Sequence, residues 1–443
     1  MIRKTLTIVL ILFVVNTIYS QTQKEKHPFT KEELRKRMFT IVDKYLDGSQ
    51  HPETFVIYSG KPYLSGPRKG KWMMSPEEVK AGTVNGKPRP KAFYYSGIAD
   101  TALYSGHLLI AMLEAEKATK DPRLAEDCKK LFKAMKLIGS TSKVPGVIVR
   151  GPHPFDKTAY YDNVSVDQMS TYTMTMTRFY FSGLASKEDK EFIKNSLQNI
   201  GKRLEKNNWT VLREDGKTIC HAGGSWLSTG KYNMTAVLTA VLKSIYKVTG
   251  DKHWQDLLKR LNSENNGLRR KRLYEADWSH KHMLYSNQMS VKFNTMLMLE
   301  DDPVEKSKMQ KMLTYIAEQQ INAPFPSKWM KEIVFKSWNW QKIQDKLNWD
   351  CATLPGAKAA WGKFDPSFLS LKDKKLKTQA HLCHIEYPLV TCTMILLSND
   401  NKLIDENIPF LWDVIKNTHI YYGNTGNNLT VSALLLYAHC YGK

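Results

Sequence analysis

The sequence predicts an all-α fold, an (α/α)6 toroid of six inner and six outer helices. Three observations predict it. Helices that are apolar nearly all round alternate along the chain with helices that keep one polar face. The turns within the first three such pairs, near Asp121, Ser186 and Asp251, follow one another at equal intervals. The last helix is apolar and has no partner after it, which a ring that closes on the first helix explains.

The first residues have the form of an export signal. Arg3 and Lys4 precede an apolar run over Leu6–Val15, and the small residue Ser20 follows. We expect cleavage after Ser20, a periplasmic or secreted location, and no membrane association after cleavage. An uncleaved anchor is the alternative, but the run is short for a spanning helix. The mature chain, 21–443, is predicted to be a single toroid domain.

The first predicted helix, Lys31–Leu46, begins with a capping box, because Glu33 follows Thr30 by three positions. The stretch from about 47 to 96 is rich in Gly, Pro and Lys and predicts an irregular excursion. Short runs within it, such as Thr54–Tyr58, have the composition of strands.

The remaining helices form buried-then-amphipathic pairs, and the unpaired first and last helices complete the sixth pair. A solenoid is the alternative, but its terminal unit should carry a polar capping face, and Leu429–His439 is apolar. The predicted pairs are Ile98–Thr119 with Arg123–Ile138, Val164–Gly183 with Lys187–Leu204, Tyr232–Thr249 with Lys252–Leu261, Leu284–Leu299 with Val304–Gln320, Leu382–Leu397 with Leu403–Thr418, and Leu429–Tyr441 with Lys31–Leu46.

Polar and aromatic residues collect where the inner helices begin. In a ring whose inner helices all run the same way, these starts share one face. Aromatic rings suit the apolar faces of sugars, and helix N-termini favour an anionic group. The alternative is that these side chains are packing and caps. The candidate substrate-binding residues are Tyr95, Tyr161, Asp162, Asn163, Gln168, His221, Trp226, Asn287, Tyr387 and Asn424.

The formal net charge of +22 is spread along the chain. A basic exported protein attracts anions. Nucleic acid is disfavoured because the sequence has no zinc-finger spacing and no basic recognition helix, so we expect an acidic polysaccharide or oligosaccharide as partner. The alternative is that the lysines only keep the surface soluble.

No cofactor or metal is predicted. The sequence has no phosphate loop, no dinucleotide fingerprint and no nucleophile elbow. Its six cysteines include no CxxC pair, which argues against a zinc site but allows one or two disulfides. His381 and His384 share a helix face, but a lone histidine pair is weak support for a metal.

Asp100 and Asp167 are the candidate catalytic pair. Glycoside hydrolysis needs one carboxyl that protonates the leaving oxygen and a second that activates water or attacks directly. A structural explanation competes: Ser165 and Gln168 have capping-box spacing, and Asp167 in a first turn offsets the helix dipole. Asp162 is a reserve candidate.

Histidine offers a rival mechanism. β-Elimination at a uronic acid needs a base, an acid and a group that neutralises the sugar carboxylate. His280 or His282 with Tyr285 would supply the first two, and Asn287 would face the carboxylate. A third hypothesis is a glycan-binding toroid that does not cleave its ligand.

Two short motifs carry a resemblance to a known group of proteins. The segments GIADTALY at 97–104 and NVSVDQ at 163–168 resemble those of exported bacterial six-hairpin toroid proteins that act on polysaccharides. That group includes unsaturated glucuronyl and rhamnogalacturonyl hydrolases and uronate polysaccharide lyases. In the hydrolases, aspartates at the starts of two inner helices do the chemistry, similar to Asp100 and Asp167. The resemblance implies a secreted glycoside hydrolase acting on uronic-acid-containing oligo- or polysaccharides.

Overall fold

The computed structural model describes most of the chain. The described residues are 27–58, 75–81, 83–84, 87–88, 98–156, 158–220, 222–229, 232–275, 283–322, 356–362 and 381–441. The predicted signal segment and most of the glycine- and lysine-rich excursion lie outside these ranges.

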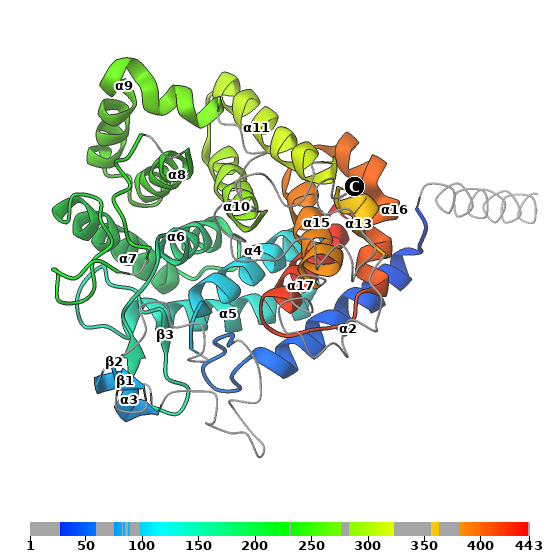
Figure 1. Ribbon diagram of the computed structural model, residues 1–443, viewed down its shortest axis with the longest axis horizontal. Helices are drawn as coiled ribbons and strands as arrows, with labels where there is room; N and C mark the ends of the chain where they lie inside the picture. Colours follow the sequence, from blue (N-terminus) through cyan, green and yellow to red (C-terminus); the bar gives the residue numbers. More distant parts are fainter. Residues whose placement is uncertain are drawn as a thin grey trace, which may run out of the picture.

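Six helices of the described chain form a closed inner ring (Figure 1). Each packs against the next one along the sequence, and the last packs against the first. The ring confirms the predicted all-α toroid. Its members are α4 (Thr101–Thr119), α6 (Val166–Phe181), α8 (Tyr232–Thr249), α10 (Met283–Leu299), α15 (Tyr387–Leu397), which continues the π-helical turn η4 (Leu382–Glu386), and α17 (Gly423–Tyr441).

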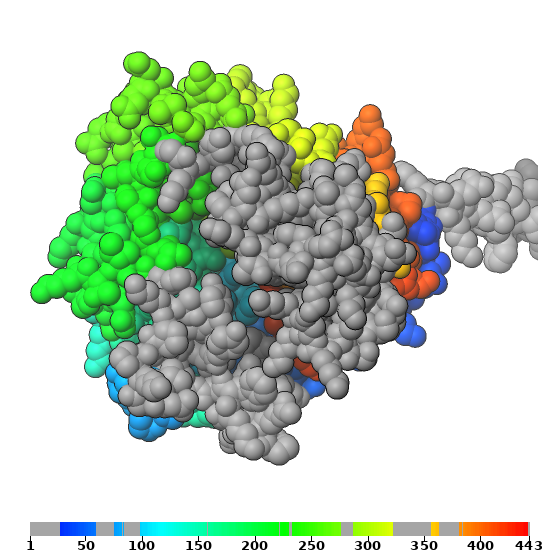
Figure 2. Space-filling view, in the orientation of Figure 1, coloured from blue at the N-terminus to red at the C-terminus, as the bar shows by residue number. Residues whose placement is uncertain are grey.

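A second layer of helices surrounds the ring. In the space-filling view, green α7 to α9 and orange α16 lie at opposite edges of the molecule (Figure 2). Helix α2 packs on α17, so the two ends of the described chain meet. The outer helices are α2 (Lys31–Ser49), α5 (Pro122–Ser140), α7 (Lys187–Lys206), α9 (Lys252–Tyr274), α11 (Pro303–Asn322) and α16 (Asn401–Asn417).

Short elements connect these helices. They are α3 (Pro76–Ala81), α13 (Ala357–Ala360), and the strands β1 (Thr83–Val84), β2 (Lys87–Pro88), β3 (Gly151–Pro152) and β4 (Tyr160–Tyr161). The strands pair in two antiparallel ribbons, β1 with β2 and β3 with β4. The β3–β4 ribbon lies directly before α6 in the sequence.

The burial of each helix follows its pattern of apolar residues. Every residue of α15 is buried, whereas α7 buries a stripe that includes Ile193, Leu197, Ile200 and Leu204. Spacings of three and four residues place such a stripe on one face of a helix. Three buried threonines on α6, Thr173, Thr175 and Thr177, donate their hydroxyls to backbone carbonyls four residues earlier, so they cost little in the core.

Two helices differ in extent from their predictions. Helix α17 begins at Gly423, before the predicted Leu429, so its asparagines lie in helical turns and not in a loop. Helix α9 does not end at Leu261. It kinks at Glu264–Gly267, where Asn265 and Asn266 are left-handed, and then continues to Tyr274. Asn and Gly tolerate that conformation, and the kink interrupts the apolar period on which the prediction relied.

The first helix confirms its predicted start. Thr30 and Glu33 form both bonds of the capping box before α2. Among the described cysteines, Cys128, Cys220 and Cys392 are buried free thiols, and Cys440 is also buried. The described residues also contain no His, Cys, Asp and Glu cluster suited to a metal ion, and no described helix is long and apolar enough to cross a bilayer.

Candidate active site

The starts of α4 and α6 meet through the carboxylate of Asp100. Asp100 precedes α4 in the left-handed conformation, with φ 61° and ψ 18°, and its side chain makes no cap bond to that helix. Its Oδ1 accepts hydrogen bonds from Arg150 Nη2 and from Gln168 Nε2, both at 2.6 Å. The side chain remains 23% exposed. Asp100 therefore serves a polar cluster and not its own helix.

The β3–β4 ribbon brings Arg150 to this cluster. Thr101 Oγ1 donates to the Arg150 carbonyl oxygen at 2.6 Å. The next residue must be glycine, since a Cβ on Gly151 would lie 2.2 Å from the Ile98 carbonyl oxygen. Arg150 is 4% exposed, and its Nε has no hydrogen-bond partner among the described residues. A buried guanidinium beside Asp100 stabilises the charged carboxylate.

Asp167 is the second residue of α6 and is bound from two other positions. Ser165 Oγ donates to its Oδ1, and Gln288 Nε2 on α10 donates to its Oδ2 at 3.2 Å. The predicted capping box between Ser165 and Gln168 is wrong: Ser165 makes no side-chain cap bond, and Gln168 binds Asp100. Both side chains bind carboxylates because charge-assisted bonds are stronger than bonds to a neutral N–H.

A buried lysine lies near Asp167. Lys292 is fully buried on α10, and its Nζ donates to the Gln288 carbonyl oxygen at 3.3 Å. Burial lowers the pKa of Lys292 to about 8, against the opposing charge of Asp167. Burial, reinforced by the charge of Lys292, also lowers the pKa of His107 to about 3, so that imidazole is neutral at physiological pH.

A small cavity inside the ring is lined in part by His107. Its volume is about 10 Å³, and it is lined by His107, Asn287 and Asn428 among apolar neighbours. His107 Nε2, Asn287 Oδ1 and Asn428 Nδ2 have no hydrogen-bond partner within the described part of the chain. That size and that set of donors and acceptors suit one water molecule.

A third carboxyl belongs to the same end of the ring. Glu386 is buried where η4 meets α15, and it accepts a bond from Asn424 Nδ2 on α17. Burial raises the pKa of Glu386. Burial also raises the pKa of the Tyr104 phenol, with further contributions from the charges of Asp100 and Glu386, so both carboxyls act on that tyrosine. A buried carboxyl with a raised pKa has the property a general acid needs.

Other predicted site residues support the loop before α6. Arg213 donates to Asp162 through Nη2 at 2.6 Å and Nε at 3.1 Å. Asn163 Nδ2 donates to the buried Tyr161 hydroxyl at 3.0 Å. Tyr160 donates to Glu214 at 2.7 Å, and burial followed by that carboxylate raises its pKa to about 12. These contacts hold the β3–β4 ribbon and therefore position Arg150.

Two predicted residues face the interior. Trp226 is fully buried and its ring lies 6.4 Å from that of Trp209. Tyr387 is buried and donates to the Gln320 carbonyl oxygen at 3.0 Å. Tyr95, His221, His280 and His282 lie outside the described residues, as does the side chain of Tyr285. The histidines of the elimination hypothesis are thus not described.

Sequence reasoning missed Arg150 and Lys292, and it did not assign a role to Glu386. A signal for the first two exists, since Arg150 directly follows the apolar run Val147–Val149 and Lys292 is the single charged residue of the segment Met289–Met298. Charged residues are rarely buried unless they are paired. Such an interruption of an otherwise buried segment marks a position worth examining.

Comparison with known proteins finds a likeness in structure and none in sequence. No family model matches the sequence, and no curated protein matches it significantly. Among solved structures, the chain is similar to a mannosidase of glycoside hydrolase family 76 from Bacteroides thetaiotaomicron. The TM-score is 0.48 at 12% sequence identity, over 93% of this chain and 98% of the mannosidase chain.

Proposed function

We propose that this protein is an exported glycoside hydrolase that acts on acidic, uronic-acid-containing oligo- or polysaccharides. Asp100 and Asp167 are its acid/base pair. One observation carries the proposal: both aspartates stand at the starts of inner helices, and each accepts a hydrogen bond from a side chain of another inner helix. The donor is Gln168 for Asp100 and Gln288 for Asp167.

The chemistry follows from two carboxyls with different surroundings. Arg150 stabilises the charged form of Asp100, which suits a base or nucleophile. Asp167, which Ser165 and Gln288 orient, is the second carboxyl of the pair. Glu386 offers an acid at the same end of the ring, and burial, which raises its pKa, supports that role.

The preference for an acidic sugar rests on positive charge near these carboxyls. Arg150 has a spare donor, Lys292 is a buried cation, and the chain as a whole carries a net charge of +22. The N-termini of parallel inner helices add partial positive charge at the same end. A uronate carboxylate would be attracted to that field.

The test is an assay of the full chain on acidic polysaccharides and on their unsaturated fragments. We expect new reducing ends, with no new ultraviolet absorbance from an unsaturated product. Asp167→Asn should lower turnover by about 10³-fold or more while the protein stays folded. New unsaturated absorbance would instead establish a lyase. Binding without new reducing ends would establish a glycan-binding toroid, and full activity of Asp167→Asn would remove Asp167 from the pair.

A further inference from the structure

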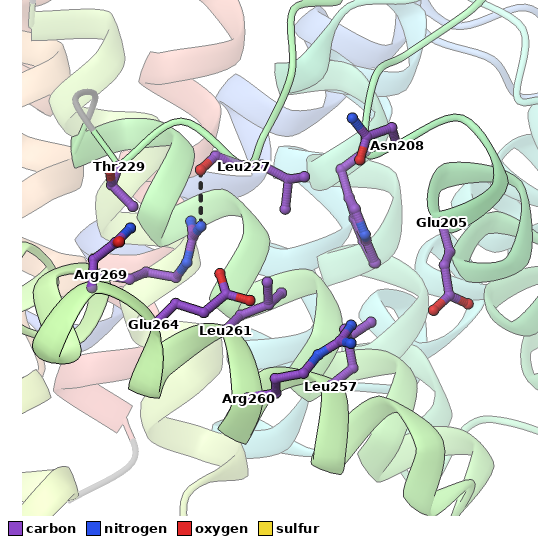
Figure 3. A pocket seen from close by; sticks show the side chains of 11 residues that line it. Glu205, Asn208, Leu227, Thr229, Leu257, Arg260, Leu261, Glu264 and Arg269 are labelled. Carbon is purple, nitrogen blue, oxygen red and sulfur yellow. Dashed lines mark hydrogen bonds between the residues drawn. The ribbon is translucent and has the colours of Figure 1, made fainter.

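A second pocket lies in the outer layer, between the end of α7, the residues that follow it, the segment before α8, and α9 on both sides of its kink (Figure 3). Its volume is about 360 Å³, which is within the range of small-ligand sites. None of the residues that line it belongs to the carboxyl cluster at the ring. It is therefore a separate site.

A buried cation with unused donors lines this pocket. Arg269 is 2% exposed, and its Nη2 donates to the Leu227 carbonyl oxygen at 2.9 Å. Its Nε and Nη1 have no partner among the described residues. Burial lowers the pKa of Arg269, and the only opposing charge of note is that of Glu264. A buried guanidinium in this state favours an anionic acceptor.

A second arginine and an apolar wall complete the pocket. Arg260, an exposed residue on α9, lines it together with Leu257 and Leu261 (Figure 3). Trp209 and Asn208 line the opposite side, and both have left-handed backbone, with φ of 56° and 50°. Non-glycine residues in that conformation cost free energy and concentrate at ligand sites.

The combination favours one chemical class. The buried guanidinium of Arg269 suits a carboxylate, the leucines and Trp209 suit the apolar face of a sugar ring, and Asn208 suits hydroxyl groups. A bare inorganic anion would leave the apolar wall unused. A neutral sugar would offer Arg269 only hydroxyl oxygens, which accept weaker hydrogen bonds from a guanidinium than a carboxylate does.

We propose that this pocket is a second binding site, outside the ring, for a sugar residue that carries a carboxylate. Arg269 binds the carboxylate, Arg260, which Figure 3 shows apart from Arg269, attracts it from elsewhere on the lining, and the two lining carboxylates, Glu205 and Glu264, repel it. The site does not depend on the hydrolysis proposed at the ring. It would hold an acidic polymer even if the ring has another activity.

Calorimetric titration of the full chain with glucuronate, glucose and sulfate tests the site. We expect Arg260→Ala to weaken one glucuronate-binding event about tenfold, because a lining cation that attracts the carboxylate is lost. The matched control is Lys259→Ala, which removes the preceding cation on the same helix; that cation is paired with Asp256 at 3.7 Å and does not line the pocket. Glu264→Gln should strengthen the same binding event.

Three results would overturn the proposal. They are unchanged glucuronate binding in Arg260→Ala, equal binding of glucose, or sulfate binding as tight as that of glucuronate. Arg269→Met should also abolish this binding event, provided that thermal unfolding shows an intact fold. If Arg269→Met does not fold, Arg260→Ala still tests the site, because Arg260 is exposed and its replacement should not disturb the fold. The titration measures binding and not turnover. The binding proposal and the hydrolysis proposal can therefore fail separately.

Discussion

Two buried arginines lie at opposite ends of the inner ring, and their surroundings differ. Arg178, near the C-terminal ends of the inner helices, donates to Thr295 at 3.0 Å, to Glu114 at 2.6 Å and to Asn294. Arg150, at the N-terminal ends, has a strong bond to Asp100, a long one of 3.3 Å to a carbonyl oxygen, and an unused Nε. Each donor nitrogen of Arg178 has a hydrogen-bond partner, whereas the Nε of Arg150 has none among the described residues.

This difference indicates which end of the ring stabilises the fold and which end can bind a ligand. A fully bonded buried ion is costly to disturb because each partner loses its compensation. A cluster with spare donors and a left-handed aspartate gives up stability that a ligand can restore. Substitutions at each end of the ring test this distinction.

The largest expected effect is on stability at the end of the ring where Arg178 lies. Arg178→Met should lower the free energy of unfolding by about 4 kcal/mol, since it leaves Glu114 and Asn294 without their partner. Chemical denaturation measures this, and turnover per folded molecule should stay within about twofold. Arg150→Met should show the reverse pattern, with a smaller loss of stability and a larger loss of turnover. Equal stability losses at the two positions would remove the distinction.

The next effect is a pH dependence that belongs to Lys292. Its pKa falls from 10.5 in the unfolded chain to about 8 in the fold, so the unfolded state binds more protons between these values. The penalty of burying the charged lysine is present below pH 8 and is relieved as the pH rises toward 10.5. Relative to Lys292→Met, the free energy of unfolding of the natural protein should rise by about 3 kcal/mol across this window. Parallel pH profiles of the two proteins would contradict the burial of a charged lysine.

The smallest effect compares two serines at helix starts. Ser186 forms a full capping box on α7, whereas Ser165 binds Asp167. Ser186→Ala should cost about 1 kcal/mol of stability with unchanged turnover. Ser165→Ala should cost little stability but lower turnover roughly fivefold, because the carboxyl loses its orienting donor. Thermal unfolding and steady-state rates measure both effects. A stability loss for Ser165→Ala as large as that for Ser186→Ala would count against the role of Ser165 in orienting Asp167.

The ring could be predicted because its signal is local and repeated. Each inner helix is apolar around its circumference, and each outer helix has one buried stripe, so the alternation appears in the sequence before any contact is known. The start of α2 was predictable for the same reason, since Thr30 and Glu33 are three residues apart. The length of α9 was not, because its kink at Asn265–Gly267 interrupts the period.

The site could be predicted only in part. Asp100 and Asp167 were found as carboxyls at helix starts, but Arg150 reaches Asp100 through a ribbon that no local pattern announces. The spacing of Ser165 and Gln168 predicted a cap, and tertiary contacts with two carboxylates replaced it. Lys292 was missed because the apolar pattern around it predicts a core helix and assigns no role to a single lysine. Long-range pairing, not local propensity, decides these side chains.

The most direct measurement pairs the acidic partners of the two arginines. Asp100→Asn and Glu114→Gln each remove one negative charge from a buried guanidinium, and Asn keeps the left-handed backbone at position 100 accessible. Turnover on the acidic substrate found in the assay above is measured per folded molecule for both. We predict a loss of about 100-fold or more for Asp100→Asn and less than about twofold for Glu114→Gln. Full turnover by Asp100→Asn, or an equal loss in both proteins, would contradict the assignment of catalysis to the N-terminal end of the ring.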